Sequence, residues 1–321
     1  MRFILLTIVI LSFNLIAIAQ KPQPEEPAEI TSEDFGRTRD LLNDGKSVFV
    51  FRKPSYRLKR TIPRPKKVPV AHNGTKNVTA KSEYKLPVDT KSPEAWEKIG
   101  ITFWRLTTDA KKALDENQTA RMLVQESGAS KEYTPQRVAA DTVFSRGDKV
   151  RLSIESPRSG YLYIVDREIY ADGRLGEPMQ IFPTMMARRG NNLIQPGWIA
   201  DVPAQTDQTP YFTLKSDNPN WRGELLTVIV SPEPLSDMGL PDKPSPISAA
   251  LVKALEDKYQ RDTTEYEQQG TEGKSYTKAE KEAGGDNKRQ LTQDDPFPQT
   301  VYRVKVRPKE PMMINLNLKV K

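Results

Sequence analysis

The sequence predicts an all-β fold, an antiparallel β-sandwich of the Ig-like kind. Short segments of alternating apolar and polar residues recur every 8 to 12 residues or so, with turn residues between them. Only 36% of the 321 residues are hydrophobic, and 26 are prolines. These proportions favour one packed domain flanked by weakly packed segments. The chain has no cysteine, so the sandwich has to be stable without disulfide bonds.

Composition divides the chain into five expected parts: a signal peptide at 1–19, a largely disordered Pro/Lys-rich tail at 20–95, a β-sandwich at 96–235, an insertion at 236–299 and a β-hairpin at 300–321. The insertion is expected to contain a helix at about 246–260, followed by a flexible linker. Residues 262–296 have almost no aliphatic side chains, so we expect their removal to cost little stability.

The first twenty residues, "MRFILLTIVILSFNLIAIAQ", have the organisation of an export signal. Arg2 supplies a short positive region, an apolar run follows, and Ala17-Ile18-Ala19 is a small-x-small cleavage pattern. We therefore expect an exported protein, periplasmic or extracellular, cleaved before Gln20. The alternative is an uncleaved N-terminal membrane anchor, for which the apolar run is somewhat short.

The net charge of +7 has a local origin. Between Lys46 and Lys85 there are twelve basic residues and one acidic residue, Glu83. Such a basic tail could bind anionic lipid or a cell-wall polymer, or it could be only a solvated linker. We do not expect nucleic acid as a partner, because an exported protein rarely meets it. Within this tail, "KSVFVFRKP" at 46–54 could form a short edge strand.

Alternation predicts the strands of the sandwich in order. The clearest is "KVRLSIES" at 149–156, where Val150, Leu152 and Ile154 point to one face and the polar residues between them to the other. A turn at 157–160 follows. The other expected strands are 100–106, 121–125, 161–169, 179–183, 198–203, 211–216 and 223–231.

Two elements are expected after the sandwich. "SPISAALVKALEDKYQ" has helical spacing of its apolar residues, with Ser245 as N-cap and Pro246 at the first helical position. This helix could pack on the sandwich or bind a partner. "VYRVKVRPKEPMMINLNLKVK" contains two alternating runs around a turn at 308–311, which predicts a hairpin docked on the sandwich by its apolar face.

Residue counts exclude several chemistries. The only histidine, His72, lies in the basic tail, so a nucleophile–His–acid triad and zinc sites built from His and Cys are not expected. We predict no catalytic residues, no metal site and no cofactor. One alternative uses paired carboxylates as acid and base. The acidic residues close together in sequence are Asp166, Glu168, Asp172 and Glu177, which could equally be solvated charges.

Two loops are expected to form a partner surface, "YADGRLGEP" at 170–178 and "TMMARRGNNLIQPGW" at 184–198. Methionine, arginine and aromatic residues are enriched at protein interfaces. The candidate residues are Met185, Met186, Arg188, Arg189 and Trp198. The alternative is that Trp198 and the methionines simply cover the core.

The strand segments together resemble a known family. They are "ITFWRL", "DTVFSRGDKVRLSIESPRSGYLYIVDRE", "IFPTMMARRGNNLIQPGWIADVPAQ", "YFTLKS" and "ELLTVIVSPEPL". Over about residues 100–235 they are similar to the bacterial DUF4384 domain, especially to exported members from acidobacteria-like bacteria. The family has no assigned activity and also occurs beside protease or kinase-like domains. The resemblance therefore implies an accessory or interaction role, and it carries over no catalytic residues.

These observations favour an exported, non-enzymatic β-sandwich that binds a protein or a cell-envelope partner. The alternative is a carbohydrate-binding module or a carboxylate-based glycan-active enzyme. That alternative would need an exposed tryptophan and a cleft with two carboxyl groups about 5 to 10 Å apart.

Overall fold

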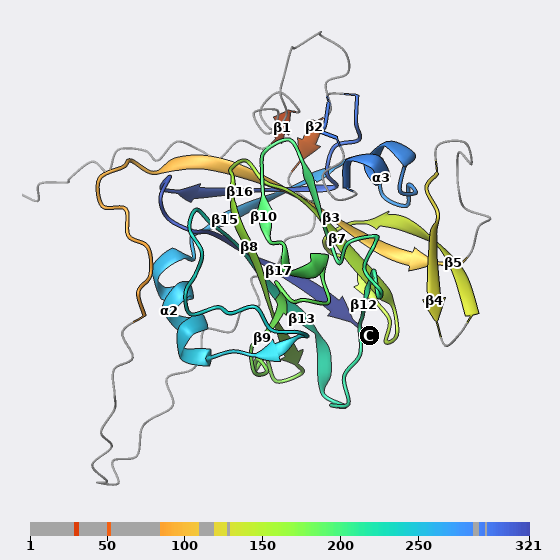
Figure 1. The fold of residues 1–321 in the computed structure, drawn as a ribbon, viewed down its shortest axis with the longest axis horizontal. Coiled ribbons are helices and arrows are strands. Elements are labelled where there is room, and N and C mark those ends of the chain that lie inside the picture. Colours follow the sequence, from red (N-terminus) through yellow and green to blue (C-terminus); the bar gives the residue numbers. More distant parts are fainter. Residues whose placement is uncertain are drawn as a thin grey trace, which may run out of the picture.

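The computed structural model describes residues 29–31, 50–52, 84–108, 119–126, 129–284, 289–292 and 294–321. In these residues the chain is mostly β-structure, folded as two packed sheets (Figure 1). The predicted all-β sandwich is confirmed. The predicted signal peptide and most of the basic tail lie outside the described residues. Among the helices that are described, none has the length and apolar character needed to cross a membrane.

The larger sheet has ten strands within the described residues, in the order β1-β2-β15-β16-β3-β5-β4. One edge of β3 pairs first with β16 and then with β5, while its other edge pairs with β7, which also pairs with β11 and β12. The strands are β1 (Glu29–Thr31), β2 (Val50–Arg52), β3 (Ala95–Thr107), β4 (Met122–Glu126), β5 (Ala129–Val138), β7 (Lys149–Glu155), β11 (Ile199–Val202), β12 (Phe212–Thr213), β15 (Thr263–Gln268) and β16 (Thr300–Val306).

The smaller sheet has seven strands within the described residues, in the order β14-β9-β8-β13-β17-β6, with β10 also paired to β8. Its pairs are antiparallel apart from β17 and β6, which run parallel. The strands are β6 (Val143–Phe144), β8 (Gly160–Tyr170), β9 (Met179–Phe182), β10 (Leu193–Ile194), β13 (Trp221–Ser231), β14 (Ser245–Pro246) and β17 (Met312–Val320).

The main core lies between the two sheets and follows the alternation of the strands. Leu152 and Ile154 of β7 are completely buried there, as are Ile101 of β3 and Ile164 of β8. Each strand buries the residues at every second position against the facing sheet, which is the physical basis of the alternating pattern in the sequence. Each expected strand of the segment 96–235 has a counterpart at or near its predicted position.

The predicted C-terminal hairpin is wrong in its pairing. β16 pairs with β3 and β15 in the larger sheet, whereas β17 pairs with β13 and β6 in the smaller one. The turn between them crosses from one sheet to the other. The predicted apolar rows do face the core, with Val304 and Leu316 as examples. Alternation fixes which side chains point inward, but it does not say which strand lies alongside.

The predicted helix packs on the outer face of the smaller sheet as α2 (Ala249–Tyr259), at the left of Figure 1. Leu251 and Leu255 belong to the same buried cluster as Ile229 of β13. The prediction of Ser245 as N-cap is wrong, because Ser248 accepts a hydrogen bond from the Leu251 amide and Ser245 lies in β14. Pro246 continues that strand instead of starting the helix.

The prediction of a flexible linker at 262–296 is also wrong for its described residues. β15 lies within the larger sheet between β2 and β16, and α3 (Lys278–Gly284) follows it. Tyr276 is completely buried, and its ring meets that of Trp104 edge to face, with 4.8 Å between centroids. The segment is polar because it covers polar groups, and hydrophobicity alone does not reveal such an element.

The groups under this segment form a buried network on the outer face of the larger sheet. Arg151 of β7 and Asp201 of β11 form an ion pair with essentially no solvent exposure. Asp201 also accepts hydrogen bonds from the hydroxyls of Ser153 and Tyr276, and Gln205 donates to both Asp201 and Tyr276. Burying a charge is unfavourable unless such partners are present. The segment that contributes Tyr276 is therefore needed to keep the pair satisfied.

Part of the predicted N-terminal tail also belongs to the domain. β1 and β2 pair with each other, and β2 pairs with β15 at the edge of the larger sheet. Tyr84 packs against the α2 layer, and its hydroxyl is 2.8 Å from that of Ser248. The basic residues between Arg52 and Tyr84 therefore connect two ordered parts of the domain; their own structure lies outside the described residues.

Tyr276 tests whether the insertion is part of the fold. We expect Tyr276→Phe to lower the free energy of unfolding by about 1–3 kcal/mol, because Asp201 loses a donor. Tyr276→Ala should cost about 3–5 kcal/mol, because a buried ring is also removed. Urea unfolding measures both. Lys278→Ala, an exposed neighbour on α3, is the control and should change little. If Tyr276→Ala has the same free energy of unfolding as the parent protein, the interpretation of this segment as a flexible linker would be correct.

Candidate functional site

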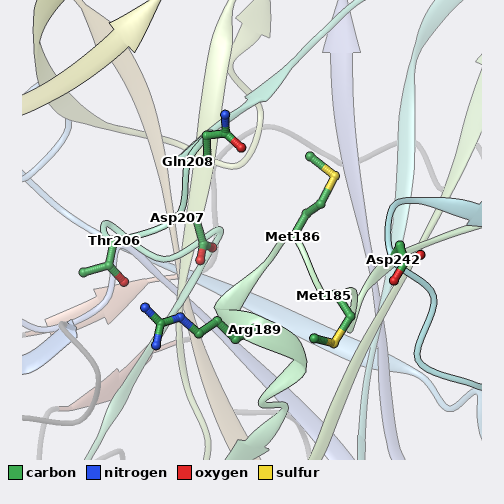
Figure 2. A pocket seen from close by; sticks show the side chains of 7 residues that line it. All are labelled: Met185, Met186, Arg189, Thr206, Asp207, Gln208 and Asp242. Atoms are coloured by element: carbon green, nitrogen blue, oxygen red, sulfur yellow. The ribbon is translucent and has the colours of Figure 1, made fainter.

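Three loops surround a shallow hollow of about 370 Å³ (Figure 2). The loops follow β9, β11 and β13 in the chain. The residues that line the hollow are Met185, Met186, Arg189, Thr206, Asp207, Gln208 and Asp242. We call this feature the methionine–arginine hollow. Three of the five predicted surface residues, Met185, Met186 and Arg189, are among its lining.

Backbone hydrogen bonds hold the methionine loop against the loop after β13. The amide of Met185 donates to the Pro241 carbonyl at 2.9 Å, and the amide of Met186 donates to the Asp242 carbonyl at 3.1 Å. The buried Gln180 side-chain amide donates to the Pro183 and Gly239 carbonyls. The side chains of Met185 and Met186, which are 47% and 54% exposed, are thus presented to solvent by a backbone that hydrogen bonds hold in place.

Asp207 joins the methionine loop to the loop after β11. Its carboxylate accepts hydrogen bonds from the Arg188 amide at 3.0 Å and from the Ala204 amide at 2.7 Å. A carboxylate that accepts backbone N–H groups in this way is a structural cap of a loop. Asp207 therefore holds two loops together, a role that was not predicted from the sequence.

The two predicted arginines have an unusual backbone. Arg188 and Arg189 have φ values of 51° and 50°, in the left-handed region that non-glycine residues seldom adopt, within the short 3₁₀ turn η3 (Arg188–Gly190). Asp207 helps to hold this conformation through the Arg188 amide. Arg189 is exposed at the hollow, whereas Arg188 is half-buried and is not among the lining residues.

The fifth predicted residue, Trp198, lies outside this set. It directly precedes β11, is half-buried and does not line the hollow. The structure adds Leu240 instead, an apolar side chain that is 52% exposed and lies against Gly190. Leu240 also lines a second hollow of about 420 Å³. The loop after β13 contributes residues to both hollows, Asp242 to the first and Leu240 to the second.

The acidic residues proposed as a catalytic pair separate into two groups. Asp172 forms an ion pair with Arg174, and Glu177 is exposed, as expected of solvated charges. Asp166 and Glu168 instead lie on β8, beside Glu224 of β13, which the sequence analysis missed. Neither hollow described above is lined by these residues. Among the described residues, no group of three or more His, Asp or Glu residues is placed to hold a metal ion.

Asp166 and Glu224 share an unusual environment. The Glu224 side chain accepts a hydrogen bond from the Trp221 indole at 3.0 Å, while its other oxygen and one oxygen of Asp166 are buried without a donor. Burial raises the pKa of Asp166 to about 7. Burial, together with the charges of Asp166 and Glu168, raises the pKa of Glu224 to about 9. A proton held between the two carboxyl groups satisfies both orphan oxygens.

Comparison with protein-family models, curated proteins and solved structures finds no match for this chain. The resemblance to the DUF4384 domain therefore stays a prediction.

The carboxyl pair predicts how stability depends on pH. Because folding raises both pKa values, the folded protein binds more protons than the unfolded chain between about pH 4 and the raised values. Stability should therefore fall as pH rises from 5 to 8, by about 1.4 kcal/mol per pH unit for each proton that the pair still holds. Urea unfolding at several pH values measures this dependence.

Glu224→Gln should flatten the pH dependence, because the amide stays neutral and can donate to Asp166. Asp172→Asn, which changes an exposed carboxyl in the loop after β8, should leave the dependence of stability on pH unchanged. An equal slope in Glu224→Gln and the parent protein would contradict the shared proton.

Proposed function

We propose that this protein is an exported, non-enzymatic binding module whose methionine–arginine hollow receives a protein partner of the cell envelope. The observation that carries the proposal is the pair of exposed side chains at Met185 and Met186, on a loop that is hydrogen-bonded to the loop of the exposed Leu240. Large apolar side chains that gather at the surface of a folded domain commonly mark a contact site.

The composition of the surface suits a protein partner. Methionine adapts its shape to an apolar neighbour, and arginine contributes planar donors at the same place. The hollow combines both with the acids Asp207 and Asp242. A partner segment with an apolar anchor flanked by polar or charged groups fits this mixture better than a purely apolar ligand.

The fixed backbone of the loops adds to this argument. Binding costs less when the contact residues are already held in place, since less conformational freedom is lost. The hydrogen bonds from the methionine loop to Pro241, Asp242 and Asp207 provide such preorganisation. We infer that the loops present a ready-made surface and do not have to fold around the partner.

The glycan alternative has less support. Asp207 is occupied as a loop cap, and Asp166 and Glu224 do not line either hollow. Trp198, the aromatic residue expected at the surface, is only half-exposed and lies outside the hollow. A sugar platform would need an open aromatic face beside free hydrogen-bonding groups, and the hollow offers apolar thioethers instead.

The remaining partner proposal concerns the basic segment. Its net positive charge between Lys46 and Lys85 suits an anionic lipid surface or a cell-wall polymer. This attraction would hold the domain near the envelope, while the methionine–arginine hollow selects the protein.

Site-directed photo-crosslinking tests the proposed surface. A photoreactive residue at position 186 of the full chain should yield one discrete crosslinked protein from envelope extract, identified by mass spectrometry. The same residue in place of Leu123, which is 70% exposed on β4, should not yield it. Arg189→Glu should reduce the yield from position 186 about tenfold, a loss of about 1.4 kcal/mol in binding.

The outcome against the proposal is equally direct. If positions 186 and 123 label the same proteins to the same extent, the hollow is not a specific contact site. An unchanged yield with Arg189→Glu would show that Arg189 does not contact the partner, and it would leave only the methionines in the proposed contact site.

A further inference from the structure

The methionines of this chain differ sharply in exposure. Seven of the eight are in the described residues. Four of them are at most 5% exposed, namely Met122, Met238, Met312 and Met313. Met179 is partly buried against the main core. Met185 and Met186 alone among the described methionines have about half of their surface open to solvent.

The chemistry of the rest of the chain increases this contrast. There is no cysteine, so no thiol competes for a two-electron oxidant. The sulfur of the buried Met122 also accepts a hydrogen bond from Arg151 at 3.0 Å, which engages a sulfur lone pair that would otherwise attack an oxidant. Susceptibility of methionine follows access to the thioether. The exposed pair in the methionine–arginine hollow is the most accessible soft nucleophile that the described residues provide.

We propose that Met185 and Met186 form an oxidation site, where peroxide converts the thioethers to sulfoxides and thereby weakens docking of the protein partner at the hollow. The second part rests on the proposed function; the first part does not.

The reaction is balanced by the peroxide alone. A sulfur lone pair of the methionine attacks one peroxide oxygen, the S–O bond forms and the O–O bond breaks. The departing hydroxide takes up the proton of the transferred hydroxyl group and leaves as water. Sulfur is oxidised by two electrons, and hydrogen peroxide is reduced to water. The sulfoxide can be reduced again by methionine sulfoxide reductases, for which an exposed loop is an accessible substrate.

The consequence for the hollow follows from polarity. Each sulfoxide replaces an apolar thioether by a strong hydrogen-bond acceptor, so an apolar anchor of the partner loses its contact surface. Arg189 lines the same hollow, with its guanidinium on the side of Thr206 and Asp207, away from the two sulfurs (Figure 2). The oxidised methionine surface would therefore be polar. The fold itself should persist, because both side chains lie outside the core.

Peptide mapping of the purified full-length protein after a time course with hydrogen peroxide tests the site. Sulfoxide should form at Met185 and Met186 several-fold faster than at Met179 or at any buried methionine. In urea the differences should disappear, because exposure and not sequence context causes them. Equal rates at Met179 and at the exposed pair in the folded protein would overturn the oxidation site.

Crosslinking from position 208, at the rim of the hollow, tests the effect on docking. Peroxide treatment should lower the yield several-fold in the parent chain but not in the Met185→Leu/Met186→Leu variant, which keeps apolar volume and cannot be oxidised in the hollow. Met179→Leu is the matched control and should behave like the parent chain. Selective oxidation with an unchanged yield overturns the regulatory part alone. Absence of any crosslinked partner before treatment counts against the proposed function, while the mapping still decides the oxidation site.

Discussion

The ion pair between Arg151 and Asp201 is the constraint on which the outer layer of the larger sheet depends. Both charges lie on strands whose opposite faces form the main core, so neither can turn toward water. Breaking such a pair by removing one partner is strongly destabilising, because the remaining charge is buried alone. The chain satisfies Asp201 with Ser153, Tyr276 and Gln205, and it needs the segment around α3 to do so.

This requirement explains why the segment around Tyr276 has the composition of a linker although it is part of the fold. The region around Tyr276 is rich in Gly, Lys and Glu, which is also the composition of a solvated linker. Glu280 of α3 nevertheless pairs with the buried Arg137 of β5, and Gly284 lies so close to Asp201 that a side chain there would collide with its carboxylate. A single sequence does not distinguish polar residues that face water from polar residues that face a buried charge.

The positions of the strands could be predicted from the sequence more readily than the pairing between them. Alternation reveals β7, β8 and β17 because a residue in a half-buried strand contacts the core at every second position. The pairing of β16 with β3 depends on contacts about 200 residues apart, which no local pattern encodes. The same limit applies to the site. Residue type indicated Met185, Met186 and Arg189, but the roles of Asp207 and Leu240 come from loops brought together by the tertiary fold.

The crossing of the chain between β16 and β17 also orders the events of folding. Both strands are interior members of their sheets, β16 between β15 and β3 and β17 between β13 and β6. In synthesis they are made after every other described strand. Until residues 300–320 have been made, each sheet is divided into two parts with unpaired edges, and neither can close. Closure of the two sheets is therefore one coupled event, because the two strands that complete them are consecutive in the chain.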